Sequence, residues 1–114
     1  GGKEMAAIAG SVIAARLRNI PVLLDGYICT SAAATLTLYN KNILDHCLIS
    51  HISTEPGHLG ILSHLNKDTI LNLNLRLGEG SGAAVASLII KAALEVHNGM
   101  STFVEAGVNK RTRE

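Results

Sequence analysis

Apolar and polar positions along the chain alternate between helix-like and strand-like periods. Residues 4–18 carry Ala, Ile and Leu on one face, which predicts a helix that ends near Asn19. Gly10 and Ser11 in the middle of this helix reduce its stability, so we expect close packing against a neighbour there. Further helices are predicted over residues 31–38, 56–65 and 83–96, with a short helical stretch over 101–105.

Three apolar runs between these helices have the character of strands. Residues 20–26 begin with a continuous apolar run and end with Asp25 and Gly26. Such a run is typical of a parallel strand buried on both faces. Residues 47–50 predict a second buried strand. Residues 70–75 alternate apolar and polar side chains, which favours a third strand, although a helix leading into a loop fits the same residues.

A polar, glycine-containing segment follows each of the three strand-like runs, at residues 25–30, 50–58 and 78–82. In an open α/β sheet the carboxyl ends of the strands form the edge where ligands bind. We therefore expect these three segments to converge there. The predicted fold class is α/β, a portion of a doubly wound, mainly parallel Rossmann-like sheet covered by helices, with residues 1–114 as a single domain.

Composition and charge restrict the partners of the chain. Hydrophobic residues make up 47% of the 114 residues but aromatic residues only 3%, so the core must be built from Ala, Leu, Ile and Val. The net charge is +1, and the only basic run is the tail at 110–114, which we interpret as a solvated terminus. This pattern lacks the electrostatic footprint of a nucleic-acid-binding protein.

Cysteine usage and hydropathy indicate the compartment. Cys29 and Cys47 stand far apart and outside any C-x-x-C motif, which predicts free thiols in a reducing cytoplasm. The chain shows no signal peptide, and no apolar run reaches the roughly 18 residues that a membrane span needs. We therefore expect a cytoplasmic protein without a nucleic-acid or membrane partner.

The glycine-rich stretch at residues 75–84 is the part of the sequence on which the chemistry depends. Its three glycines, Gly78, Gly80 and Gly82, lie between the third strand-like run and the longest predicted helix. Glycines at such a turn permit positive φ and a close approach of ligand to backbone. Glu79 is either a helix-start residue that complements the macrodipole or a group with a chemical role. Its position between two glycines favours the chemical role, because a helix-start Glu needs no such flanks.

Other groupings of reactive residues are weaker candidates. The glycine spacing lacks the G-x-G-x-x-G dinucleotide fingerprint, and no Lys-Ser/Thr follows for a Walker loop. Four side chains of metal-ligand type match no zinc spacing: His46, Cys47, His51 and His58. The residue types of a hydrolytic triad occur without a G-x-S-x-G elbow, at Ser50, His51 and Glu55. We expect neither a metal site nor a hydrolase.

Residues 75–84 (Leu-Arg-Leu-Gly-Glu-Gly-Ser-Gly-Ala-Ala) resemble the signature near the carboxyl end of the nicotinate-nucleotide–dimethylbenzimidazole phosphoribosyltransferase family. Three further stretches agree with the family and come in its order, at residues 1–7, 21–27 and 50–58. Residues 100–108 (Met-Ser-Thr-Phe-Val-Glu-Ala-Gly-Val) resemble the family's closing motif, Met-Ala-Thr-Phe-x-Glu-Ala-Gly-Val. The resemblance covers nearly the whole chain.

The resemblance implies an enzyme of cobalamin lower-ligand synthesis. Members of the family transfer phosphoribose from nicotinate mononucleotide to 5,6-dimethylbenzimidazole, which gives α-ribazole 5′-phosphate and nicotinate. By resemblance, Glu79 is the catalytic base that takes a proton from the benzimidazole. Leu77 and Gly78 line the pocket of the aromatic ring, and Gly26 and Ser53 lie around the ribose and phosphate of the nucleotide. The resemblance also implies a homodimer that needs neither a metal nor another cofactor.

The family's members are roughly three times as long as this chain, which resembles their carboxyl-terminal third. The chain begins inside a family motif at residues 1–2, from which we expect a truncated gene product, a fragment or a partial record. A second hypothesis therefore stands beside the enzyme: a non-catalytic module that binds a nucleotide or an aromatic base or that serves assembly. Apolar surface left uncovered in such a piece would favour dimerisation or aggregation.

Overall fold

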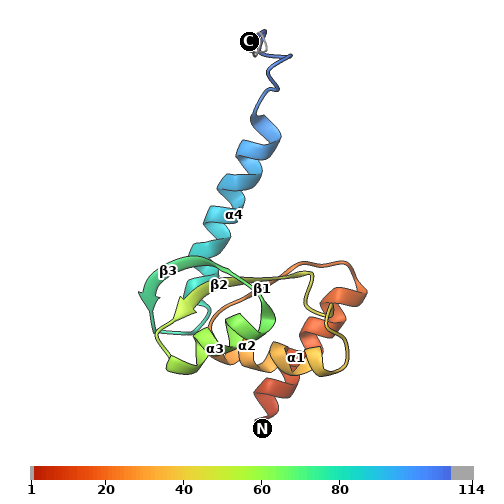
Figure 1. Cartoon of the computed structure of the whole chain (residues 1–114), viewed down its shortest axis with the longest axis vertical. Coiled ribbons are helices and arrows are strands. Elements are labelled where there is room, and N and C mark those ends of the chain that lie inside the picture. The colour runs from red at the N-terminus through yellow and green to blue at the C-terminus, as the bar shows by residue number, and fades with distance from the viewer. Residues whose placement is uncertain (1, 109–114) are drawn as a thin grey trace, which may run out of the picture.

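The computed structural model describes residues 2–108 (Figure 1). The basic tail at 110–114 and the first residue of the amino-terminal motif lie outside the described residues. Helices and strands alternate along the chain, as the hydropathy pattern predicts. The elements are α1 (Lys3–Leu17), β1 (Val22–Leu24), α2 (Tyr27–Ala34) continued by the 3₁₀ helix η1 (Thr35–Leu38), β2 (Cys47–Ser53), α3 (Pro56–Leu65), β3 (Thr69–Leu75) and α4 (Ser81–Gly99).

The strands form a parallel sheet in the order β1-β2-β3. Buried apolar side chains of the central strand and its neighbours hold the sheet in register, with Leu24 beside Ile49. The pairing of β2 with β3 is irregular, because one residue of β2 lies opposite three of β3 between the pairs His51–Leu71 and Ser53–Leu75. Asn74 adopts a left-handed φ of 53° within this irregularity. The extra residues bring the end of β3 level with Ser53.

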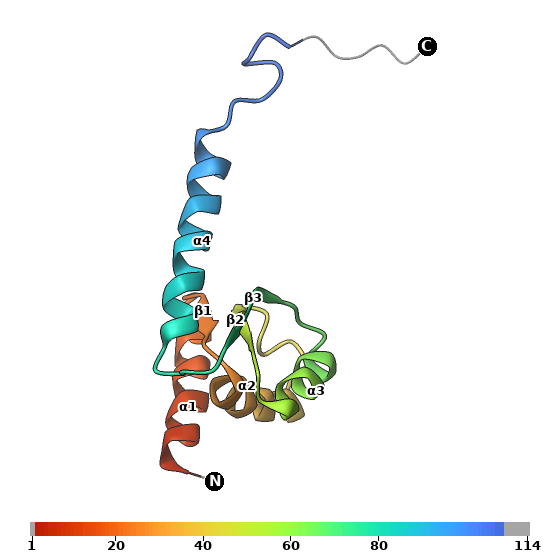
Figure 2. The same cartoon turned by 90° about the vertical axis from the view of Figure 1, so that its left-hand side faces the viewer.

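Helices cover both faces of the sheet, which confirms the doubly wound α/β prediction (Figure 2). The start of α4 packs on one face and contacts all three strands, whereas α2 and α3 pack together on the other, with α1 against α2. The core is aliphatic, as the low aromatic content requires. It is formed by Val12, Leu24, Ala33, Leu36, Leu44, Cys47, Ile49 and Leu62.

Two of the predicted helices differ from the structure. The helix predicted at 31–38 begins four residues earlier, at Tyr27, because Gly26, two residues after the end of β1, serves as its N-cap. The helical stretch predicted at 101–105 is wrong, because the chain forms one capped turn there. Thr102 and Glu105 exchange backbone and side-chain hydrogen bonds as in a capping box, but Gly107 at φ 67° ends the turn immediately.

α4 extends away from the sheet (Figure 1), and part of its surface is an uncovered apolar stripe. Val85, Leu88, Ile89 and Val96 recur at helical spacing on this stripe and are between 42% and 66% exposed. Within residues 2–108, no helix is both long and apolar enough to cross a membrane. A contiguous exposed apolar surface of this kind is typical of a protein–protein contact.

We expect the isolated 114-residue chain to self-associate through this stripe. Replacing Leu88 and Ile89 together by Gln removes apolar area from its centre and should shift the chain toward monomer in sedimentation-velocity experiments. Ser87→Gln, exposed on the opposite face of α4, is the control and should leave the distribution unchanged. A wild-type chain that stays monomeric at high concentration would contradict this expectation.

Candidate functional site

The three polar segments meet at the carboxyl ends of the strands. They enclose a cavity of ≈ 780 Å³ between the end of β1, the end of β2 and the loop from β3 to α4. All five residues that the resemblance assigned to substrate or catalysis line this cavity: Gly26, Ser53, Leu77, Gly78 and Glu79. The convergence expected from the parallel topology is therefore present, whereas the individual roles of the five residues stay predictions.

The loop that carries Glu79 is held in an unusual backbone conformation. Gly78, Glu79 and Gly80 all have left-handed φ values, of 75°, 55° and 75°. This region is natural for glycine but rare for a residue with a Cβ. The amide of Ser81 donates to the carbonyl of Gly78 at 2.9 Å, which closes the turn into α4. Strain of this sort at a non-glycine residue is typical of functional sites.

The Glu79 carboxylate and the neighbouring Leu77 side chain present different chemistry to the same cavity. Both are exposed, and Leu77 is 78% exposed although it is a large apolar residue. An exposed Leu next to an exposed carboxylate offers an apolar contact for a flat ring and an acceptor for a proton on the edge of that ring. Glu79 is the third residue before the first buried position of α4, so the helix fixes the loop without burying the carboxylate.

Asp25 connects the end of β1 to the start of α4. Its Oδ1 accepts a hydrogen bond from the backbone amide of Ala83 at 2.8 Å. This amide belongs to the first turn of α4, where backbone donors have no helical partner. The Asp25 carboxylate thus caps the helix that follows the Glu79 loop, and its charge complements the positive end of the helix dipole. Sequence reasoning placed Asp25 at a strand end but could not pair it with a residue 58 positions away.

Replacing Asp25 by Ala should lower the free energy of unfolding by about 1 to 2 kcal/mol, the usual effect of losing a helix cap. Urea unfolding measures this change, and hydrogen exchange should show lost protection at the Ala83 amide. Ser87→Ala is a matched control, because the Ser87 hydroxyl bonds only within α4 and is exposed. An unchanged Ala83 exchange rate in the Asp25 variant would show that the bond does not hold the helix.

The buried ring of His51 packs against the start of α4 at Gly82. The ring is 2% exposed, and its Nδ1 lies 2.9 Å from the Ser50 hydroxyl. The Ser50 hydroxyl donates to the backbone carbonyl of Asp25, so it accepts from an Nδ1–H of His51. Nδ1 also lies 3.9 Å from the Asp25 carboxylate. A Cβ built on Gly82 would lie 1.9 Å from this nitrogen, so only glycine permits α4 to pack this closely.

The alternative groupings from the sequence do not form reactive sites. Ser50 is fully buried and bonded to a backbone carbonyl, which leaves no accessible nucleophile for a hydrolytic triad. Within residues 2–108, no three His, Cys, Asp or Glu side chains are arranged to hold a metal ion. His46 bonds to the carbonyl of Val12 at 3.1 Å. Burial raises the pKa of the Cys47 thiol, against smaller opposing effects of Lys67 and Arg16, so the thiol stays protonated and inert.

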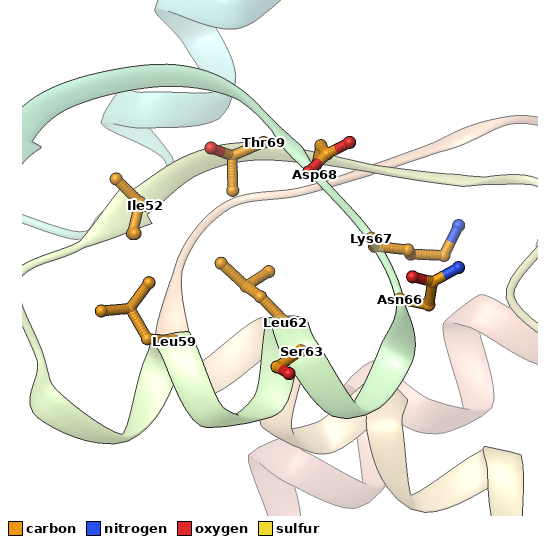
Figure 3. A pocket seen from close by; sticks show the side chains of 8 residues that line it. All are labelled: Ile52, Leu59, Leu62, Ser63, Asn66, Lys67, Asp68 and Thr69. Carbon is orange, nitrogen blue, oxygen red and sulfur yellow. The ribbon is translucent and has the colours of Figure 1, made fainter.

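A smaller cavity of ≈ 450 Å³ lies between α3 and the start of β3 (Figure 3). Leu59, Leu62 and Ile52 form its apolar side. The ammonium group of Lys67, at its other end, donates to the carbonyl of Cys47 at 2.9 Å and is therefore engaged in the fold. This cavity contains none of the five candidate residues.

The fold and the cavity define a class, that of parallel α/β proteins with a ligand site at the carboxyl ends of the strands. Comparison with known proteins is more specific. The family model described as phosphoribosyltransferase matches residues 1–108. The chain belongs to this phosphoribosyltransferase family.

Individual relatives agree with that assignment. The nicotinate-nucleotide–dimethylbenzimidazole phosphoribosyltransferase of Agrobacterium fabrum is 57% identical over 111 residues, which are 97% of this chain and 32% of that protein. The enzyme of the same name from Rhizobium leguminosarum bv. trifolii is 55% identical over 111 residues. The crystal structure of the Thermus thermophilus enzyme superimposes with a TM-score of 0.88 at 38% identity, over 97% of this chain and 33% of that chain. The chain therefore spans about a third of the length of the relatives it matches.

Proposed function

We propose that the chain forms the carboxyl-terminal third of a cytoplasmic phosphoribosyltransferase that moves phosphoribose from nicotinate mononucleotide to 5,6-dimethylbenzimidazole. The products are α-ribazole 5′-phosphate and nicotinate, in the synthesis of the lower ligand of cobalamin. The observation that carries the proposal is the position of Glu79, exposed at the cavity beside Leu77 and at the carboxyl ends of the strands. The names of the relatives supply the two substrates.

The proposed reaction uses Glu79 as a general base. One nitrogen of the benzimidazole attacks C1′ of the ribose, and the bond from C1′ to the nicotinate nitrogen breaks with its electron pair on that nitrogen. The attacking ring becomes positively charged, and the proton on its other nitrogen passes to the Glu79 carboxylate. Leu77 and Gly78 hold the flat ring against the loop. The backbone of Gly26 and the hydroxyl of Ser53 are suitable groups for the ribose and phosphate.

The charge of the cavity supports this assignment. Its lining includes one guanidinium, that of Arg76, and four carboxylates, those of Glu4, Asp25, Glu55 and Glu79. Carboxylates stabilise a neighbouring positive charge. Nicotinate mononucleotide carries a pyridinium nitrogen before the reaction, and the benzimidazole becomes positive during it, so this lining is suited to both ring systems.

The proposal is tested by incubating the chain with both substrates and separating α-ribazole 5′-phosphate by chromatography. Product formation supports the enzyme, and its absence shows that this third of the enzyme does not turn over by itself. The second candidate, a non-catalytic module that binds a nucleotide or an aromatic base, then predicts binding of at least one substrate in calorimetry. The proposal includes a homodimer, for which the apolar stripe on α4 is the candidate contact surface.

A further inference from the structure

His58 is fully buried, and both nitrogens of its ring have protein partners. Its Nδ1 lies 2.9 Å from the backbone amide of Ser53. Its Nε2 lies 3.2 Å from the hydroxyl of Thr30, which is also fully buried. The reaction proposed above does not use either side chain. His58 therefore links separate elements of the fold beside the large cavity, which Ser53 lines.

The hydrogen-bond partners determine the protonation of the ring. The Ser53 amide can only donate, so Nδ1 must carry a lone pair. The Thr30 hydroxyl donates its single proton to the carbonyl of Gly26 at 2.8 Å. It therefore accepts from His58, whose Nε2 must carry the proton. The result is one directed chain from the Ser53 amide through a neutral imidazole to the Gly26 carbonyl.

The two ends of this chain are both candidate substrate residues. Gly26 follows β1 and Ser53 ends β2, and both line the large cavity. We propose that His58 is a positioning residue that fixes the Gly26 and Ser53 backbones in the geometry that binds the ribose phosphate of the nucleotide, and that only its neutral, Nε2-protonated form does so. The nucleotide part of this inference rests on the proposed function.

The surroundings of the ring favour the neutral form. Burial, and to a smaller extent the nearby His51 on β2, lower the pKa of His58. Besides its two hydrogen-bond partners, the neighbours of the ring include the Tyr27 ring on α2, at a centroid distance of 6.0 Å, and His51. Protonation would place an Nδ1–H against the Ser53 amide, two donors facing each other. The link therefore breaks as the pH falls.

His58→Gln tests the proposal, because the amide of Gln reaches the position of Nε2 but leaves the Ser53 amide without an acceptor. We expect affinity for nicotinate mononucleotide to fall about tenfold, the usual scale for a buried donor left unpaired, with dimethylbenzimidazole affinity unchanged. His58→Asn, which returns an acceptor near Nδ1, should recover part of the loss. His64→Gln, on the exposed side of the same helix, is the matched control and should bind as the wild type does.

A pH series separates positioning from general destabilisation. Nucleotide affinity of the wild type should fall on acidification more steeply than that of His58→Gln, and the difference between the two profiles removes the titration of the phosphate itself. Long-range ¹H–¹⁵N NMR spectra of the imidazole rings should show His58 neutral with its proton on Nε2. These spectra and the exchange rate of the Ser53 amide need no ligand, so they decide the His58 link even if the wild type binds no nucleotide and the proposed function fails.

Three results would overturn the proposal. The first is a His58 proton on Nδ1, or a His58 that titrates at the ordinary value of 6.5. The second is a Ser53 amide that exchanges equally fast in wild type and His58→Gln. The third is a wild type that binds the nucleotide while His58→Gln binds it equally well. Thr30→Val, a nearly isosteric change that removes the acceptor for Nε2–H, gives an independent test if the Gln variant fails to fold.

Discussion

Glu79→Gln is expected to lower the rate of α-ribazole 5′-phosphate formation by at least about 100-fold, the usual scale for losing a general base. Gln keeps the volume and the polarity of the side chain but cannot accept the benzimidazole proton. The side chain is exposed, so the free energy of unfolding should stay the same. A chromatographic product assay and a urea unfolding curve on the same protein measure both quantities.

Glu95→Gln is the matched control for this prediction, because it makes the same chemical change on the exposed outer half of α4. It should leave the rate unchanged. A Glu79→Gln variant that keeps most of the wild-type rate would contradict the assignment of the base. A variant that loses rate together with stability would place Glu79 in the structure of the loop instead of in the chemistry.

Gly82→Ala is expected to destabilise the protein by about 3 kcal/mol, at the upper end of the range for overpacking a core. The added Cβ would lie 1.9 Å from Nδ1 of His51, whose ring is buried and bonded to Ser50. The ring cannot move aside without breaking that bond, so α4 must shift. The shift would also stretch the hydrogen bond between Asp25 and Ala83. Chemical denaturation measures the change.

Gly60→Ala is the control for Gly82→Ala. Gly60 lies on the exposed side of α3, and an added Cβ would meet nothing within 4 Å. This change should raise stability by up to about 1 kcal/mol, because Ala is the better helix former. Equal effects of the two substitutions would show that the contact between α4 and His51 leaves room for a methyl group at position 82.

Packing at glycine shows what the sequence could and could not predict. Hydrophobic periodicity predicted the order of helices and strands, because burial on one or two faces imposes a regular spacing of apolar residues on the sequence. Close packing at a glycine imposes no such spacing. From the sequence we expected close packing at Gly10, around which there is open space. Gly82 instead packs closely, against His51. Only the approach of α4 to His51 distinguishes the two positions.

The candidate site, too, was only partly predictable from the sequence. Parallel topology predicted that the three polar segments would meet, and the resemblance named the five residues that now line one cavity. The supporting contacts were not predictable, because they join positions far apart in the chain. Asp25 reaches Ala83 across 58 residues, and His58 reaches Thr30 across 28. In the sequence, His58 was a weak metal-ligand candidate, and only its hydrogen bonds to Ser53 and Thr30 reveal a structural link.

An NMR titration tests whether this chain carries a substrate site at the carboxyl ends of its strands. The ¹⁵N-labelled chain would be titrated first with nicotinate mononucleotide and then with 5,6-dimethylbenzimidazole. We expect the nucleotide to shift the amide signals of Gly26 and Ser53, and the benzimidazole to shift those of Leu77, Gly78 and Glu79. Shifts confined to the cavity between α3 and β3, or no shift with either compound, would contradict this expectation.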